Sequence, residues 1–267
     1  MFACLYSSGN DPEQILPQLA IIAAVVGLFV GQAFHLVFDR VYTDTPLGGP
    51  LNRCPACRAS LHPAHTLPLV GLVLSRGRCP HCSARFPWHA LLLPVGTAAL
   101  FAVSTLVFDE LGAGLLGGFF ATVFLVLTLT DLERRLIPNR IVYPSVVLAI
   151  ALSWGWPDSS VVDVLAGGLV GVAIAAGLLL FSLPFGVNAF GMGDVKMIVL
   201  IGFVVGLPAI IVGAFLGTIG GGVAAALLLL LRLRSRRDYI PHGPFLALGA
   251  IVALFWGQDI WDWYTNR

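Results

Sequence analysis

Long apolar runs dominate this chain, and they constrain its fold more than any other feature. A soluble domain carries about 25% charged residues, whereas this chain of 267 residues is 11% charged and 58% hydrophobic. Several runs reach the ~20 residues that a helix needs to cross a bilayer. Because backbone groups in lipid must be satisfied within the segment, each span is expected to be a helix. The sequence therefore predicts an all-α polytopic membrane protein.

About eight transmembrane helices are expected. Their predicted bounds are 17–38, 90–108, 112–130, 140–156, 162–183, 195–206, 208–231 and 244–260. The chain then has three parts: a tail with the first helix (1–38), a cytosolic loop domain (39–89) and a seven-helix membrane core (90–267). The first run is long for a signal peptide and has no basic residue before it, so we expect a retained helix.

The basic residues indicate the orientation of these helices. With the N-terminus outside, the predicted cytosolic segments are 39–89, 131–140, 184–196 and 232–243. They hold all of the 15 Lys and Arg residues except Arg267, as the positive-inside rule requires. An even number of spans then places both termini outside. The formal net charge of +1 offers no long-range attraction for nucleic acid, so no nucleic-acid partner is expected.

The predicted cytosolic loop contains two C-x-x-C pairs, "CPAC" at 54–57 and "CPHC" at 79–82. Four thiolates at such spacing can surround one tetrahedral Zn²⁺, and a loop too short for its own core needs such a staple. The expected ligands of a structural zinc ion are Cys54, Cys57, Cys79 and Cys82. Two disulfides or four free thiols are the alternatives, although disulfides rarely persist in the cytosol.

Four histidines lie in or beside this loop: His62, His65, His81 and His89. Cys4 lies outside the group and is expected to be incidental. A complete set of four cysteines needs none of them, so we expect the histidines at the surface first and as substitute ligands second.

Two acidic residues lie at the edges of predicted spans. Asp131 ends the third span, and Asp194 begins the sixth within "GMGDVK" (191–196). Acids at the membrane are costly and mark functional sites. Both lie near the predicted cytosolic interface, so a fold that packs these helices together pairs the two carboxylates. Such a pair can work as general acid and general base.

The residues around Asp194 suit such a site. Gly191 and Gly193 permit backbone angles closed to other residues and let a substrate strand approach closely. Lys196, the only lysine in the chain, supplies either a nearby positive charge or a cytosolic anchor. A helix N-terminus at this point would stabilise the carboxylate.

Plain structural roles are the alternatives for these side chains. For Asp194 the alternative is a plain helix N-cap after a glycine turn, a position that aspartate favours. For Asp131 the alternative is an ion pair with an arginine at helical spacing. His35 is expected to be a buried hydrogen-bonding residue. Asp39 and Arg40 are expected to form a local ion pair at the interface.

Several segments together resemble the type IV prepilin peptidases, aspartic proteases of the bacterial inner membrane. "GMGDVK" matches their G-x-G-D motif, and "DLERRLIPNRI" (131–141) looks like their D-x-x-x-x-x-I-P-[ND] segment. "PHGPFLALGA" (241–250) is similar to their segment before the last helix. "GQAFHLVFDR" (31–40) is a weaker likeness, with His35 where Asn is usual. The paired C-x-x-C loop is also a family feature.

The resemblance implies a membrane aspartic endopeptidase with Asp131 and Asp194 as catalytic residues and no catalytic metal. Its substrates would be type IV prepilins or type II secretion pseudopilins, which carry a basic leader before a hydrophobic helix. The cut would fall on the cytosolic side, and many members then N-methylate the new terminus with S-adenosylmethionine. Acidic residues are candidate contacts for the leader: Asp39, Asp44, Glu133 and Asp238.

Departures from the family pattern concern the methyl transfer. His65 and Ala90 stand where acidic residues are usual, and Pro94 stands where a small residue is usual. The missing carboxylates would remove groups that hold the amine or the methyl donor, so proteolysis is expected and methylation is left open.

Two other classes of function are alternatives. A small ion-coupled transporter or channel would use the same acids, but its acids are expected near the bilayer centre rather than at the edge. A noncatalytic pilus-assembly factor would keep the fold without the chemistry. The presence of both aspartates and both motif glycines argues against it.

Overall fold

The computed structural model describes residues 12–42, 54, 56–57, 59–60, 76–108, 110–156, 159–185, 191–233 and 241–267. The α-helices in these ranges are α1 (Pro12–Tyr42), α3 (His89–Val107), α4 (Leu111–Arg134), α5 (Asn139–Ala151), α6 (Val161–Ser182), α7 (Met192–Val205), α8 (Ala209–Leu230) and α9 (Gly243–Thr265). Short 3₁₀ turns follow α5 and α6: η3 (Ser153–Gly155) and η4 (Leu183–Phe185). Among the described residues, β-structure is limited to isolated bridge residues, at Ser60 and between Arg78 and Arg85, so the predicted all-α class is confirmed.

Each predicted span corresponds to one helix. Six of the helices are long and apolar enough to cross a membrane: α1, α3, α4, α6, α8 and α9. The two shorter ones, α5 and α7, have 13 and 14 residues. A multi-pass membrane protein is therefore confirmed, while the exact count of eight spans stays a prediction.

The chain forms two compact units. One contains Met1–Asp39 and Pro46–Thr122, and the other contains Arg40–Thr45 and Val123–Arg267. The boundary falls inside α4, whose first half belongs to the first unit and whose second half belongs to the second. The predicted three-part division into 1–38, 39–89 and 90–267 stays a prediction.

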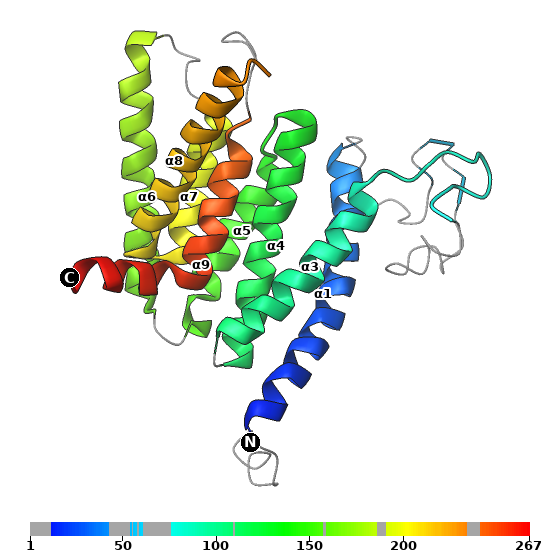
Figure 1. Cartoon of the computed structure of the whole chain (residues 1–267), viewed down its shortest axis with the longest axis horizontal. Helices are drawn as coiled ribbons and strands as arrows, with labels where there is room; N and C mark the ends of the chain where they lie inside the picture. The colour runs from blue at the N-terminus through cyan, green and yellow to red at the C-terminus, as the bar shows by residue number, and fades with distance from the viewer. Residues whose placement is uncertain are drawn as a thin grey trace. The chain divides into compact units, whose positions relative to one another are not determined.

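In the first unit, α1 and α3 lie side by side (Figure 1). Small residues allow this approach: a Cβ on Gly27 would lie 2.9 Å from Ala98 Cα, and one on Gly31 would lie 2.7 Å from Pro94 Cα. Such close backbone contact is typical of helices that pack in lipid. The hydrophobic effect does not drive their association there, and small residues allow tight van der Waals packing instead. The pairing fixes the last turns of α1 beside the first turns of α3.

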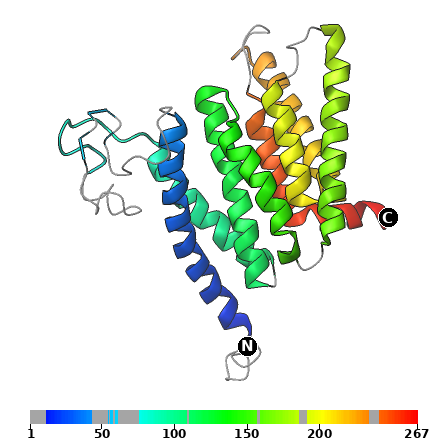
Figure 2. The same ribbon diagram turned by 180° about the vertical axis from the view of Figure 1, so that it is seen from behind.

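In the second unit, α7 is the central helix. The side chains of Met197, Leu200 and Ile201 have no exposed surface. Figure 2 shows α7 beside α6, and the backbones nearly touch, because a Cβ on Gly202 would clash with Gly167 O. A short helix with this degree of burial can hold a polar side chain at its end in a defined position.

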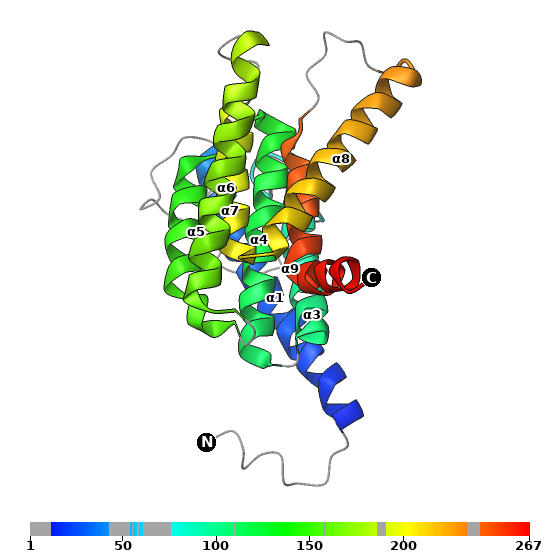
Figure 3. The ribbon, with the colours of Figure 1, turned by 90° about the vertical axis from the view of Figure 1, so that its left-hand side faces the viewer.

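The helices of the second unit alternate in direction, so their ends gather in two groups. Figure 3 shows α6 and α8 diverging toward their C-terminal ends, where α7 and α9 begin. The end of α4 and the start of α5 lie at this same end of the unit. This topology brings Asp131 of α4, Asp194 of α7 and the start of α9 together.

Candidate active site

Asp131 lies in the last turn of α4, and its side chain is almost completely buried at 4% exposure. The backbone N–H of Gly243 donates a hydrogen bond to its Oδ2 over 3.1 Å. Gly243 is the first residue of α9, where backbone N–H groups have no partner inside the helix. The carboxylate of one helix therefore accepts a free donor from the start of another, which fixes its position.

Asp194 lies in the first turn of α7 and is 8% exposed. Gly191 is the N-cap of this helix, so Asp194 is not the cap itself. Its own N–H donates to Gly191 O over 3.0 Å. A carboxylate in the first turn is stabilised by the positive end of the helix dipole, which offsets part of the cost of its burial.

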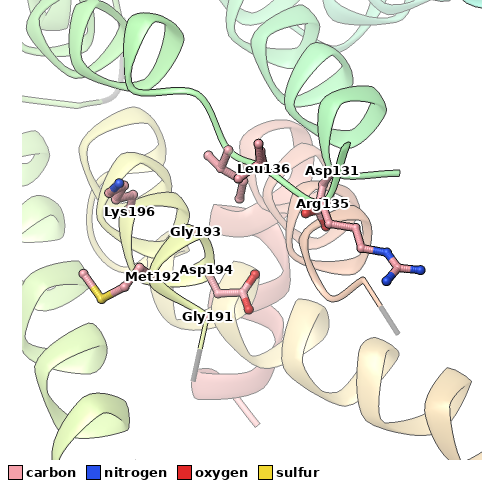
Figure 4. A pocket seen from close by; sticks show the side chains of 9 residues that line it. Asp131, Arg135, Leu136, Gly191, Met192, Gly193, Asp194 and Lys196 are labelled. Carbon is pink, nitrogen blue, oxygen red and sulfur yellow. The ribbon is translucent and has the colours of Figure 1, made fainter. Parts of the chain in front are cut away.

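The two carboxylates open onto one pocket of about 270 Å³. Figure 4 shows the Asp194 carboxylate directed toward the side of the pocket where Asp131 lies. The two groups are close enough to interact electrostatically. The pocket is lined by Asp131, Arg135, Leu136, Ile137, Gly191, Met192, Gly193, Asp194 and Lys196. Two buried carboxylates at one cavity are the arrangement in which one is ionised and the other protonated.

The connector after Asp131 forms one wall of the pocket. Arg135 follows the end of α4 with a left-handed φ of 56°, and its N–H donates to Asp131 O over 2.9 Å. The chain reverses direction at this residue. Ile137 is then buried, and Pro138 is the N-cap of α5. Arg135 also lies close enough to Asp131 for its charge to act on the carboxylate. The predicted pairing of Asp131 with an arginine at helical spacing stays a prediction.

The glycines of the motif provide space rather than unusual backbone angles. Positive φ among the described glycines occurs at Gly77 and Gly206, so Gly191 and Gly193 do not use the backbone angles that only glycine permits. A Cβ on Gly191 would lie 3.0 Å from Asp194 Oδ2, and one on Gly193 would lie 3.3 Å from the side chain of Ile137. The two glycines let the carboxylate and the connector approach the start of α7.

Lys196 points away from the two carboxylates (Figure 4). Its Nζ donates a hydrogen bond to Asn139 Oδ1 over 2.8 Å. Asn139 is the first residue of α5. The lysine thus links α7 to α5 at the rim of the pocket.

The four cysteines of the loop form one cluster. Their sulfur atoms all lie within 4.8 Å of one another, and none is in a disulfide. Cys54 Sγ lies 3.9 Å from Cys82 Sγ, and Cys57 Sγ lies 3.9 Å from Cys79 Sγ. Zn–S bonds of about 2.3 Å place tetrahedral sulfur atoms roughly 3.8 Å apart. The cluster therefore has the dimensions of a zinc site.

The two halves of this cluster have similar backbone turns. Cys54 N–H donates to Ala59 O, and Cys79 N–H donates to Ala84 O, both over 2.9 Å. Desolvation opposes ionisation of Cys79, but the backbone N–H groups of His81 and Cys82 outweigh it and lower its pKa to about 6. Burial raises the pKa of Cys54. The backbone N–H of Ala84 favours the Cys82 thiolate, but desolvation and the neighbouring thiols outweigh it and raise the pKa of Cys82 to about 12. Within the cluster the negative charge therefore favours Cys79, and the thiolate is the form that binds metals.

Some predicted residues lie outside the described ranges. They are Cys4, Asp44, His62, His65 and Asp238. Ala90 and Pro94 lie in the first turns of α3. The expected surface position holds for His81, whereas His89 is buried.

Two contacts at the site were not predicted. The hydrogen bond from Gly243 to Asp131 joins residues 112 positions apart, and only the segment "PHGPF" marked that region. No role was predicted for Asn139, although it lies in the quoted segment "DLERRLIPNRI".

Asp39 was expected to pair with Arg40. The structure places the Asp39 carboxylate 3.2 Å from His89 Nε2, and the pair with Arg40 stays a prediction.

Known proteins match most of the length of this chain. The bacterial peptidase A24 N-terminal domain matches residues 25–108, and the type IV leader peptidase family matches residues 118–226. A prepilin leader peptidase/N-methyltransferase of Bacillus subtilis is 28% identical over 250 residues, covering 92% of this chain and 97% of the relative. One of Aeromonas hydrophila is 30% identical over 224 residues, covering 82% and 76%. No solved structure matches the chain. With both domain models in order and relatives aligned along most of its length, the chain belongs to the type IV leader peptidase family.

Proposed function

We propose that this protein is a membrane aspartic endopeptidase that removes the basic leader of type IV prepilins or type II secretion pseudopilins. The observation that carries the proposal is the pair of buried carboxylates, Asp131 and Asp194, which two different helices bring to one pocket. The names of the relatives support the same activity.

The proposed chemistry is acid–base hydrolysis by the two aspartates. The ionised carboxylate takes a proton from a water molecule, whose oxygen attacks the scissile carbonyl carbon. The protonated carboxyl donates its proton to the carbonyl oxygen. Collapse of the tetrahedral intermediate breaks the C–N bond, and the amine leaves with a proton returned from the dyad. The Gly243 N–H keeps Asp131 in place throughout.

The surroundings of the pocket suit a substrate with an apolar helix. Leu136 and Met192 line it and are exposed. Exposed apolar groups beside a polar centre can contact the start of the hydrophobic segment while the leader extends toward water. Glu133 is half-buried in the same last turn of α4 as Asp131 and is a candidate contact for the basic leader, with Asp39, Asp44 and Asp238 as further candidates.

The proposed location is the bacterial inner membrane, with the active site on the cytosolic side and both termini outside. The distribution of Lys and Arg supports this orientation. The arrangement of the second unit supports placing the segments next to the active site on one side of the membrane, because the ends of α4 and α8 and the starts of α7 and α9 share one side. The transporter alternative is not favoured, because the paired acids lie at helix ends rather than at mid-helix positions.

Cleavage and methylation can be measured together. Purified enzyme with a prepilin and S-adenosylmethionine is expected to release the leader, and mass spectrometry reports both the loss of the leader and any added methyl group. Cleavage without methylation would show that His65, Ala90 and Pro94 have removed the transferase. Cleavage with methylation would show that these departures are tolerated, and failure to cut any such substrate would contradict the proposed function.

We also propose that the four cysteines hold one structural Zn²⁺. A ligand set of four thiolates is closed and leaves no position for a substrate. The double variant Cys57→Ser with Cys82→Ser is expected to lose this zinc, as measured by elemental analysis, and to become sensitive to proteases within residues 39–89. His81→Ala is the matched control in the same turn and is expected to retain the metal. Equal zinc content in all three proteins would contradict the assignment.

A further inference from the structure

Three ionisable side chains form a second cluster, within the first unit and distinct from the four cysteines. His35 and Asp39 lie one turn apart on α1, and His89 is the first residue of α3. Asp39 Oδ1 lies 3.2 Å from His89 Nε2, and Asp39 Oδ2 lies 3.7 Å from His35 Nε2. The two imidazole rings are 5.5 Å apart between centroids. One carboxylate is therefore flanked by the Nε2 atoms of two histidines.

This cluster lies where ionisable groups are costly. His35 is 9% exposed and His89 is 3% exposed, and both belong to helices that are apolar enough to cross a membrane. The Asp39 side chain is 30% exposed, which leaves a route to water on one side. Ionisable residues inside membrane helices usually serve a function.

Hydrogen bonding satisfies the His35 side chain only in part. The 3.2 Å contact with His89 is a hydrogen bond, but 3.7 Å between His35 Nε2 and the carboxylate is too long for one. His35 Nδ1 is buried and has no hydrogen-bond partner in the described part of the chain. Burying an imidazole nitrogen without a hydrogen-bond partner costs free energy. The other nitrogen, His35 Nε2, faces the Asp39 carboxylate, which already makes a hydrogen bond with His89.

We propose that His35, Asp39 and His89 form a second metal site, which takes a borderline divalent cation such as Zn²⁺. One ligand atom from each residue lies within 4.8 Å of the others. Ligands of a tetrahedral zinc ion stand about 3.4 Å apart, so shifts of roughly an ångström in the side chains close the site. Two imidazoles and a carboxylate suit Zn²⁺ rather than Ca²⁺ or Mg²⁺, which prefer oxygen ligands.

The composition of this site differs from that of the cysteine cluster. Three protein ligands leave one coordination position for water or another small ligand, and the exposed side of Asp39 gives access to it. The site also joins the end of α1 to the first residue of α3. A bound ion would therefore tie together the two ends of the long insertion between these helices.

Cobalt distinguishes the two sites by spectroscopy. Metal-free full-length protein in detergent is expected to bind two Co²⁺ ions per chain, one with the thiolate-to-metal absorption of a cysteine site and one without it. His89→Gln and Asp39→Asn are each expected to remove only the ion without thiolate absorption. The Cys57→Ser and Cys82→Ser double variant is expected to remove only the other ion. His81→Ala, an exposed histidine, serves as a control and is expected to keep both.

X-ray absorption at the zinc edge tests the same proposal on the unaltered chain, in case a variant fails to fold. Zinc-loaded wild-type protein is expected to show a mixed first shell of sulfur and nitrogen or oxygen. A shell of sulfur alone, with one ion per chain, would overturn the second site. A second ion that persists in both His89→Gln and Asp39→Asn would also overturn it. Neither result depends on cleavage of a prepilin, so the proposed function stands or falls separately.

Discussion

Replacement of Asp194 by Asn is expected to abolish leader cleavage, and Asp131→Asn is expected to do the same. An amide has the shape of the carboxyl group but can neither accept the proton of water nor donate one to the carbonyl. Loss of a general acid or base costs about 10²–10⁴-fold in rate, and members of a catalytic unit fail together rather than additively. Each variant is therefore expected to fall to background in a cleavage assay read by mass spectrometry, and the double variant to be no worse.

The structure supplies controls for this experiment. Asp262 is an exposed aspartate in the last turns of α9, where it accepts a hydrogen bond from Gln258. Asp262→Asn is expected to keep full activity, because this carboxylate does not line the pocket. The thermal unfolding midpoint and the metal content of all variants should match those of the wild type. Wild-type cleavage by Asp194→Asn would exclude the proposed mechanism.

The helices could be predicted closely from the sequence, because apolar length is nearly sufficient to define a membrane helix. The predicted and observed bounds differ where a helix continues beyond its apolar residues or ends before them. The third predicted span, 112–130, corresponds to Leu111–Arg134, since charged residues can continue a helix past the apolar core. The fourth, 140–156, stops at Ala151 and changes to a 3₁₀ turn at Ser153–Gly155, which ends at the glycine of "GWP" (155–157).

The two aspartates could be singled out from sequence because a charge inside an apolar run is conspicuous. Their common pocket depends on how α4 and α7 pack, which no local pattern specifies. The cluster of His35, Asp39 and His89 was missed for the same reason. The i, i+4 spacing of His35 and Asp39 is visible in the sequence, but His89 follows 50 residues after Asp39 and reaches it only because α1 and α3 pack together.

Gly243→Ala is expected to reduce cleavage strongly without unfolding the protein. A Cβ at this position would lie 2.5 Å from Asp131 Oδ2 and 2.9 Å from its Cγ, so the carboxylate must move. Displacement of a catalytic group by about 1 Å can cost about 10²-fold in rate. Because the carboxylate acts on the chemical step, the loss is expected in kcat, with a smaller change in KM.

Glycines elsewhere in the second unit separate this effect from a general effect of Gly→Ala. Gly220 and Gly222 lie in α8, and a Cβ on either would meet nothing within 4 Å. Alanine is favoured over glycine in a helix by up to about 1 kcal/mol, so Gly220→Ala and Gly222→Ala are expected to unfold at or slightly above the wild-type temperature, with unchanged kcat. If Gly243→Ala were as active as these two, the close approach of the start of α9 to the Asp131 carboxylate would have no part in holding it for catalysis. A loss of kcat in Gly243→Ala alone, at an unchanged unfolding temperature, would show that the start of α9 positions the catalytic aspartate of α4.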